Sequence, residues 1–215
     1  MGGRGGSSGM GGGSGENVNI IETGDIWTYR HNPNNEPFVD AINEGARKIQ
    51  DDFEDLMTES LNEIHVAQLG GEDKQTILGF YERTGKLLAL NANFTNIDKM
   101  NSVYDQATEQ KFHPSRGNLT GTEAVALHEL GHALNDHIAK KMGLDMDVAA
   151  RKIFEAAYRA TKGKGRYQEW AGQISGYAKK NYAETIAEAV SDYYCNGNNA
   201  HPHSVAIMRE LMKYK

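Results

Sequence analysis

Apolar residues in the first half of the chain follow one helical pattern and two strand patterns. After Pro37 they recur every three or four positions as far as Ile64, which predicts a single long amphipathic helix. β-Branched and aromatic residues on both sides of short glycine-containing turns predict β-hairpins over residues 18–29 and 76–94. Residues 95–119 contain Asn, Asp, Gly and Pro without sustained periodicity, so we expect an irregular connection there.

Helical patterns dominate the second half of the chain. Thr120 and Glu123 have the Thr-x-x-Glu spacing of a capping box, and Gly143 provides a stop, which predicts a helix of about six turns. Three further helices are expected, at 145–161, 182–195 and 204–214. Two hairpins and a long helix followed by a helical second half predict an α+β fold with a small, mostly antiparallel sheet.

The composition indicates a tail and a single folded unit. Residues 1–16 are mostly Gly and Ser, which bury too little surface to offset the entropy of ordering, so we expect a flexible tail. The remaining residues, 17–215, are enough for one domain with a substantial core. Apolar residues make up 39% of the chain and charged residues 24%, which is typical of soluble globular proteins, and no apolar run could cross a membrane.

Charge and cysteine content exclude several classes of protein. With a formal net charge of -6 and no long basic cluster, the chain lacks the electrostatic surface of a nucleic-acid-binding protein. The start of the chain has no apolar segment of the kind that a signal peptide needs, so we expect a cytoplasmic protein. Cys195 is the only cysteine, which excludes an internal disulfide framework and argues against a cysteine nucleophile.

The string His128-Glu129-Leu130-Gly131-His132 carries the strongest chemical signal. Residues four apart on a helix lie about 40° apart around the axis and about 6 Å along it, so both imidazoles can reach one metal ion. Glu129 is rotated by about 100° from His128, which lets its carboxylate reach a water on the metal instead of the metal itself. Zinc lowers the pKa of such a water to about 7, so the string predicts one zinc ion per chain with Glu129 as general base.

A catalytic zinc ion needs a third protein ligand from elsewhere in the chain. The metzincin pattern would place Gly at 135 and His at 138, but the chain has Asn135 and Ile138, which excludes that class. His137 is turned about 140° from His132 around the helix, so we expect it at the surface or in the core.

A later helix offers carboxylates for this position. Glu184, Glu188 and Asp192 recur every four residues and therefore share one helical face. Glu184 lies closest to the helix start and is the predicted ligand, whereas Glu188 would accept a hydrogen bond from a zinc-binding imidazole and fix its tautomer. The spacing does not decide which of Glu184 and Glu188 binds the metal and which contacts the imidazole. The alternative for these carboxylates is a solvated acidic stripe on the helix surface.

Two segments, 124–136 around the His-Glu string and 175–189 around Glu184, resemble the glutamate-zincin metallopeptidases. The similarity is to the catalytic domain of anthrax lethal factor and to the Pro-Pro endopeptidases, and it covers little of the chain. It implies a zincin-like fold. It also implies a Tyr seven residues before the ligand Glu, and in this chain Tyr177 and Glu184 have that spacing, which supports Glu184 as the ligand. In such enzymes the Tyr hydroxyl helps to stabilise the oxyanion of the reaction intermediate.

Other parts of the chain resemble zincin domains encoded by bacteriophages and mobile elements. They are the Gly-Arg-Gly-Gly-Ser-Ser-Gly start and the approach His113-Pro-Ser-Arg-Gly. This similarity implies a protein that acts inside a bacterial host or travels with a virion. Thr185 and Ile186 depart from the paired Phe residues often seen in glutamate-zincins, a change that affects packing and no ligand.

Zincins commonly bind substrate as an added antiparallel strand at a sheet edge, and the expected edge here is Leu88, Ala89, Leu90 and Asn91. An internal strand is the alternative for this segment. The predicted function is a zinc-dependent endopeptidase that acts on protein or peptide substrates.

Other functions fit parts of the pattern. A non-catalytic phage structural or interaction protein with a zincin fold is the alternative, although structure alone would not need Glu129. A regulatory zincin that cleaves a single repressor shares the chemistry and differs in substrate range. A deformylase-like hydrolase is set aside, because that class takes a Cys ligand upstream of its motif and Cys195 lies downstream.

Overall fold

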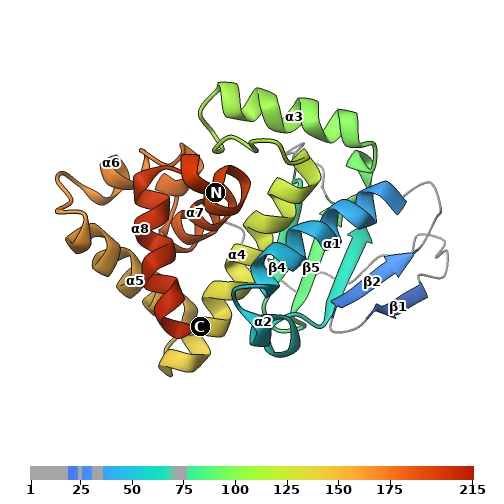
Figure 1. Ribbon diagram of the computed structural model, residues 1–215, viewed down its shortest axis with the longest axis horizontal. Helices are drawn as coiled ribbons and strands as arrows, with labels where there is room; N and C mark the ends of the chain where they lie inside the picture. Colours follow the sequence, from blue (N-terminus) through green and yellow to red (C-terminus); the bar gives the residue numbers. More distant parts are fainter. Residues whose placement is uncertain (1–18, 24–25, 31–35, 68, 70–76) are drawn as a thin grey trace.

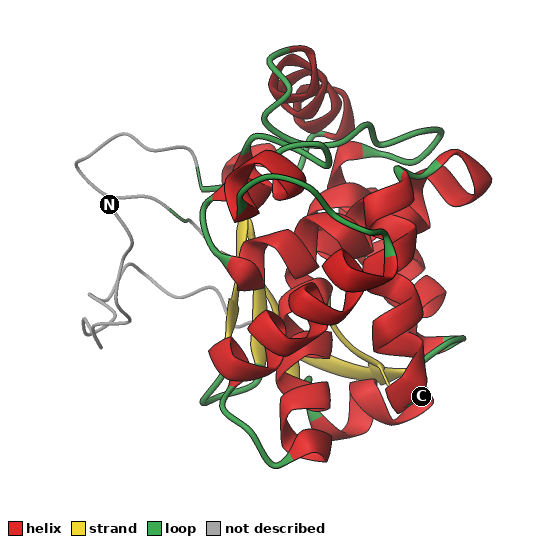
Figure 2. Ribbon diagram, turned by 90° about the vertical axis from the view of Figure 1, so that its left-hand side faces the viewer, coloured by secondary structure: helices red, strands yellow, loops and turns green. Residues whose placement is uncertain are grey.

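The computed structural model describes residues 19–23, 26–30, 36–67, 69 and 77–215 (Figure 1). The expected tail at 1–16 lies outside the described residues, as do the turn of the first hairpin and the first residue of the second. The fold is α+β and mostly helical, and Figure 2 shows short strands among a larger group of helices. In the part of the chain that is described, no helix is both long and apolar enough to cross a membrane.

Both expected hairpins are present. β1 (Asn19–Thr23) pairs antiparallel with β2 (Ile26–Arg30), and β4 (Gly79–Glu82) pairs antiparallel with β5 (Leu87–Asn91). A further strand, β3 (Glu63–Ala67), pairs in parallel with the other side of β5. The second sheet is therefore mixed, with the order β3-β5-β4.

The expectation that Leu88, Ala89, Leu90 and Asn91 form a sheet edge is wrong, because β5 is the central strand. All four residues are buried, and β5 is paired on both sides. β3 was not predicted, and the helix expected from the apolar spacing ended at Ile64, the second residue of this strand. Among the described strands of this sheet, β3 and β4 form the edges.

The single long helix expected over 37–64 is also wrong. The chain forms α1 (Glu36–Gln50), turns, forms the short α2 (Glu54–Glu59) and then enters β3. Ile64 is buried as expected, but it lies in a strand and is paired with Leu88. Short apolar runs fit a helix or a strand equally well, and here the pairing with β5 decides between them.

The helix of the His-Glu string, α4 (Gly121–Met142), has the predicted ends. Thr120 and Glu123 form the capping box, and Gly143 ends the helix with a left-handed φ of 64°. The three later helices are confirmed as α5 (Met146–Ala160), α7 (Tyr182–Asn196) and α8 (Pro202–Leu211). A short helix that was not predicted, α6 (Tyr167–Ala171), lies between α5 and α7 in the chain.

The stretch 95–119, which was expected to be irregular, contains the helix α3 (Ile97–Glu109). Asn96 caps its start by accepting a hydrogen bond from the backbone N–H of Lys99. Met100 and Tyr104 are buried one turn apart, and α3 packs against α4. The cap and the apolar spacing were present in the sequence, but the polar residues between them obscured the helical period.

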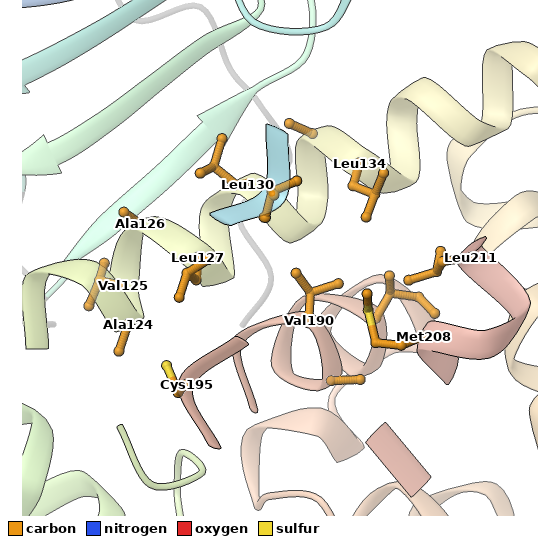
Figure 3. Packing of buried hydrophobic residues seen from close by; sticks show 14 of the residues in the cluster. Ala124, Val125, Ala126, Leu127, Leu130, Leu134, Val190, Cys195, Met208 and Leu211 are labelled. Atoms are coloured by element: carbon orange, nitrogen blue, oxygen red, sulfur yellow. The ribbon is translucent and has the colours of Figure 1, made fainter. Parts of the chain in front are cut away.

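α4 runs through the middle of the molecule, with α1 and the sheet on one side and α5, α7 and α8 on the other (Figure 1). Figure 3 shows the buried side chains of α4 beside Val190 from α7 and Met208 and Leu211 from α8. The packing of α4 on α7 is tight at Gly131, where an added Cβ would lie 2.7 Å from the Cα of Ala187. This contact fixes the position of α7, and of the carboxylates that it carries, relative to α4.

Candidate metal centre

α4 carries two imidazoles one helical turn apart. The rings of His128 and His132 lie edge to face, with centroids 5.1 Å apart. His128 is buried and His132 is partly buried. The capping box at the start of α4 and the buried apolar residues around the string make this part of the helix a firm support for both side chains.

α7 brings Glu184 to the same point. Asn181 caps α7 by accepting a hydrogen bond from the backbone N–H of Glu184 at 2.8 Å. Glu184 Oε2 lies 3.3 Å from His128 Nε2 and 3.2 Å from His132 Nε2. One ligand atom from each of the three residues lies within 4.8 Å of the others, so together they could hold a metal ion. Among the described residues, no other group of three His, Cys, Asp or Glu side chains meets this condition.

A second carboxylate, Glu188, lies behind the first imidazole. Its buried Oε1 is 2.8 Å from His128 Nδ1 and 2.8 Å from His113 Nδ1. Burial alone would raise the pKa of Glu188, but these two contacts lower it to about 2. Glu188 therefore orients the His128 ring so that Nε2 points toward Glu184. His113 was not predicted as a site residue, because it enters from the connection after α3 without a local motif.

Tyr177 and Lys180 lie beside Glu184. Tyr177 belongs to a 3₁₀ turn before α7, and its ring centroid is 5.8 Å from that of His128. Lys180 Nζ donates to Tyr177 Oη and to Glu184 Oε1, both at 2.8 Å. Burial and then the charge of Glu184 raise the pKa of Tyr177, so its hydroxyl keeps its proton at neutral pH. Lys180 was not predicted as a site residue, although its spacing of four residues from Glu184 was a visible signal.

Glu129 is buried beside the two imidazoles but does not belong to the three-residue group. Burial raises the pKa of its carboxyl, although His128 and His132 act in the opposite direction. The edge strand β4 passes close by, since a Cβ added to Gly79 would lie 3.1 Å from Glu129 Cγ. Glycine at this position therefore lets the strand approach the carboxylate.

A cleft of about 750 Å³ opens at this group of residues. Its lining comes from four parts of the chain: the segment that enters β4, α3 with the residues after it, α4, and the turn before α7. His128, Glu129 and Tyr177 all line it. The volume lies within the roughly 300–1,000 Å³ of ordinary ligand pockets, so a peptide segment could reach the candidate metal centre.

Three other residues considered from the sequence lie apart from the group. His137 is buried, with Nδ1 3.3 Å from Glu59 Oε2. Asp192 accepts hydrogen bonds from a side chain one turn later and from a backbone N–H before α8. Burial raises the pKa of the Cys195 thiol to about 12, which keeps it protonated and a poor nucleophile.

Comparisons of the chain with protein-family models, curated proteins and solved structures found no significant match. The function is therefore inferred from the chemistry of the site itself. The site consists of two imidazoles and a carboxylate that could hold a metal ion, a buried carboxylate beside them, and a cleft that leads to both.

Proposed function

We propose that the protein is a zinc-dependent endopeptidase of the glutamate-zincin branch. The observation that carries the proposal is the convergence of His128, His132 and Glu184 from two helices, with Glu129 buried beside them in the wall of a cleft. Two imidazoles and one carboxylate are a donor set of catalytic zinc sites, and they leave one coordination position open. A carboxylate base next to such a set is what the hydrolysis of an amide needs.

The donor atoms fit zinc in kind and in spacing. Two ligand atoms bound about 2.05 Å from a tetrahedral ion are about 3.3 Å apart. Glu184 Oε2 lies 3.3 Å and 3.2 Å from the two imidazole nitrogens, and it has no hydrogen-bond partner among the described residues. The two imidazoles are at ion-pair distance from this buried oxygen but outside hydrogen-bond geometry, and a bound cation would stabilise its charge.

Each remaining residue has a role in peptide hydrolysis. Zinc bound here would supply a Lewis acid that polarises the scissile carbonyl and makes a water molecule easier to deprotonate. Glu129 would take the proton from that water and pass it to the leaving amine, and its place beside the two imidazoles in the wall of the cleft suits both steps. Tyr177 would donate a hydrogen bond to the developing oxyanion, and Lys180, 2.8 Å from Tyr177 Oη, would hold that hydroxyl in place.

The edge strand β4 is the place where a substrate would pair with the sheet. β4 lies at an edge among the described strands, and Gly79 brings it against Glu129. An extended peptide paired with the backbone of β4 would run along the cleft and present its carbonyl groups to the site. β4 is therefore the proposed substrate-binding strand. The expected segment Leu88–Asn91 cannot pair with a substrate, because it is already paired on both sides.

Metal analysis combined with cleavage of a peptide library tests the proposal. The proteins to compare are the wild type, Glu129→Gln and, as a matched control, Glu155→Gln on α5, which does not line the cleft. We expect zinc near one per chain in all three, and cleavage that falls at least about 100-fold in Glu129→Gln alone. Zinc without cleavage by any of them would favour a non-catalytic role, and a wild type that binds no zinc would contradict the proposal.

A further inference from the structure

The cleft beside the candidate metal centre exposes apolar surface that catalysis does not require. Four large apolar side chains are exposed among the described residues: Ile77, Phe80, Phe112 and Val148. Ile77 and Phe112, at 42% and 45% exposed, both line the cleft, although they come from different segments. Phe80 follows Gly79 in β4, so its side chain points to the opposite face of the sheet, and it does not line the cleft. Exposed apolar surface that gathers at one place on a protein marks a binding site.

The apolar wall around Phe112 is held in place by the backbone. The N–H of Tyr177 donates to the Phe112 carbonyl at 3.0 Å, and the N–H of Gly176 donates to the Lys111 carbonyl at 2.7 Å. The Phe112 ring lies 5.0 Å from the Tyr177 ring, centroid to centroid. Val125 of α4 adds a further apolar side chain to the lining. The pocket is therefore formed in advance, so a ligand would not have to order it.

The rim of the same cleft is basic, although the chain as a whole has a net charge of -6. Lys179 and Lys180 both line it. Lys180 is occupied by its contacts with Tyr177 and Glu184, whereas Lys179 is exposed and forms no ion pair with a described residue. A carboxylate on a bound peptide that reaches this rim would be attracted to Lys179.

We propose that the cleft selects extended peptides that carry a large apolar side chain, above all an aromatic one, close to an acidic residue. The apolar side chain lies against Phe112, Ile77 and Val125, and the acidic side chain lies near Lys179. This inference rests on the proposed peptidase function and specifies the substrate class of that site.

The apolar contact and the ion pair with Lys179 contribute unequally to the binding affinity. Burial of an aromatic side chain against the pocket should tighten binding by about 10-fold or more. An exposed ion pair with Lys179 should add only about 2- to 5-fold at low ionic strength, and about 1 M salt should remove that part.

Binding of fluorescent peptides to the purified full-length Glu129→Gln protein, followed by anisotropy, separates selection from hydrolysis. The peptides are ten-residue chains of Ala and Ser that carry one Phe or Ala at a fixed position and Asp, Asn or Lys beside it. In the same background, Phe112→Ala is compared with Val148→Ala, since both residues are 45% exposed and only Phe112 lines the cleft. Lys179→Gln is compared with Lys152→Gln, an exposed lysine of α5 outside the cleft.

We expect the peptide with Phe and Asp to bind best. Phe112→Ala should weaken binding of this peptide by about 10-fold. Lys179→Gln should remove only the salt-sensitive part of its affinity, by which the Asp peptide binds better than the Asn peptide. Equal binding of the Phe and Ala peptides, equal losses in Phe112→Ala and Val148→Ala, or a preference for Lys over Asp would overturn the inference. Hydrolysis by the wild type without these preferences would also overturn it while leaving the proposed function intact. Selective binding without hydrolysis would support the inference and contradict the peptidase.

Discussion

Gly131→Ala should push apart the two helices that carry the candidate ligands. Gly131 lies inside the His-Glu string on α4, facing α7, which carries Glu184 and Glu188. An added Cβ would lie 2.7 Å from the Cα of Ala187, where ordinary contacts begin at 3.4 Å. The helices would have to separate by the difference, 0.7 Å at this point. The obstructing atom belongs to the backbone, so no side-chain rotation can relieve the clash.

The change in unfolding free energy of Gly131→Ala is the sum of two opposing effects. Overpacking a core contact costs about 1–3 kcal/mol, and a backbone contact belongs at the upper end of that range. Replacing Gly by Ala within a helix gains about 1 kcal/mol. The variant should therefore lose about 1–2 kcal/mol of unfolding free energy. Metal–ligand distances tolerate only about 0.2 Å, so a 0.7 Å shift of α7 should also weaken zinc binding by at least about 10-fold.

Urea unfolding of the metal-free protein measures the first effect, and competition with a chelator measures the second. Gly85→Ala is the control, because the atom nearest to its added Cβ, at 3.0 Å, is a side-chain oxygen of Glu82 and not a backbone atom. That variant should change stability by less than about 0.5 kcal/mol. A Gly131→Ala protein as stable as the wild type, with zinc affinity within twofold, would refute the packing argument.

Three further predictions concern single side chains. Glu188→Gln should weaken zinc binding by about 10- to 100-fold in chelator competition, because the carboxylate orients His128. The pKa of Glu188 in the folded protein is about 2, below its ordinary 4.5, so its contribution to stability is complete above 4.5 and is lost as the pH falls toward 2. Metal-free Glu188→Gln should therefore lose less stability than the wild type over that range in urea unfolding, and equal acid dependence would contradict this. Tyr177→Phe should lower kcat by about 100-fold with little change in KM, and an unchanged kcat would remove Tyr177 from the mechanism. Cys195, buried with a pKa of about 12, should react with a thiol reagent only after unfolding, and rapid labelling of the native protein would contradict its burial.

Local signals in the sequence predicted the elements that carry the site. The capping box of Thr120 and Glu123 and the stop at Gly143 gave the ends of α4, because caps depend on neighbouring residues only. The start of α7 and the shared face of Glu184 and Glu188 followed from helical spacing in the same way.

Features that depend on distant parts of the chain could not be predicted. Ile64 continued the apolar spacing of the expected helix, but it lies in β3, whose strand conformation depends on pairing with β5 more than twenty residues later. The same pairing moved Leu88–Asn91 from an expected edge to the centre of the sheet. His113 reaches Glu188 across 75 positions of sequence, so no local pattern could bring it into the site.

The most direct test of the proposed zinc peptidase is the initial rate of peptide hydrolysis, measured while zinc is returned stepwise to metal-free wild-type protein. If His128, His132 and Glu184 hold the catalytic ion, the rate should rise in proportion to bound zinc and stop rising at one ion per chain. A rate that does not depend on zinc, or that continues to rise well beyond one ion per chain, would contradict the account.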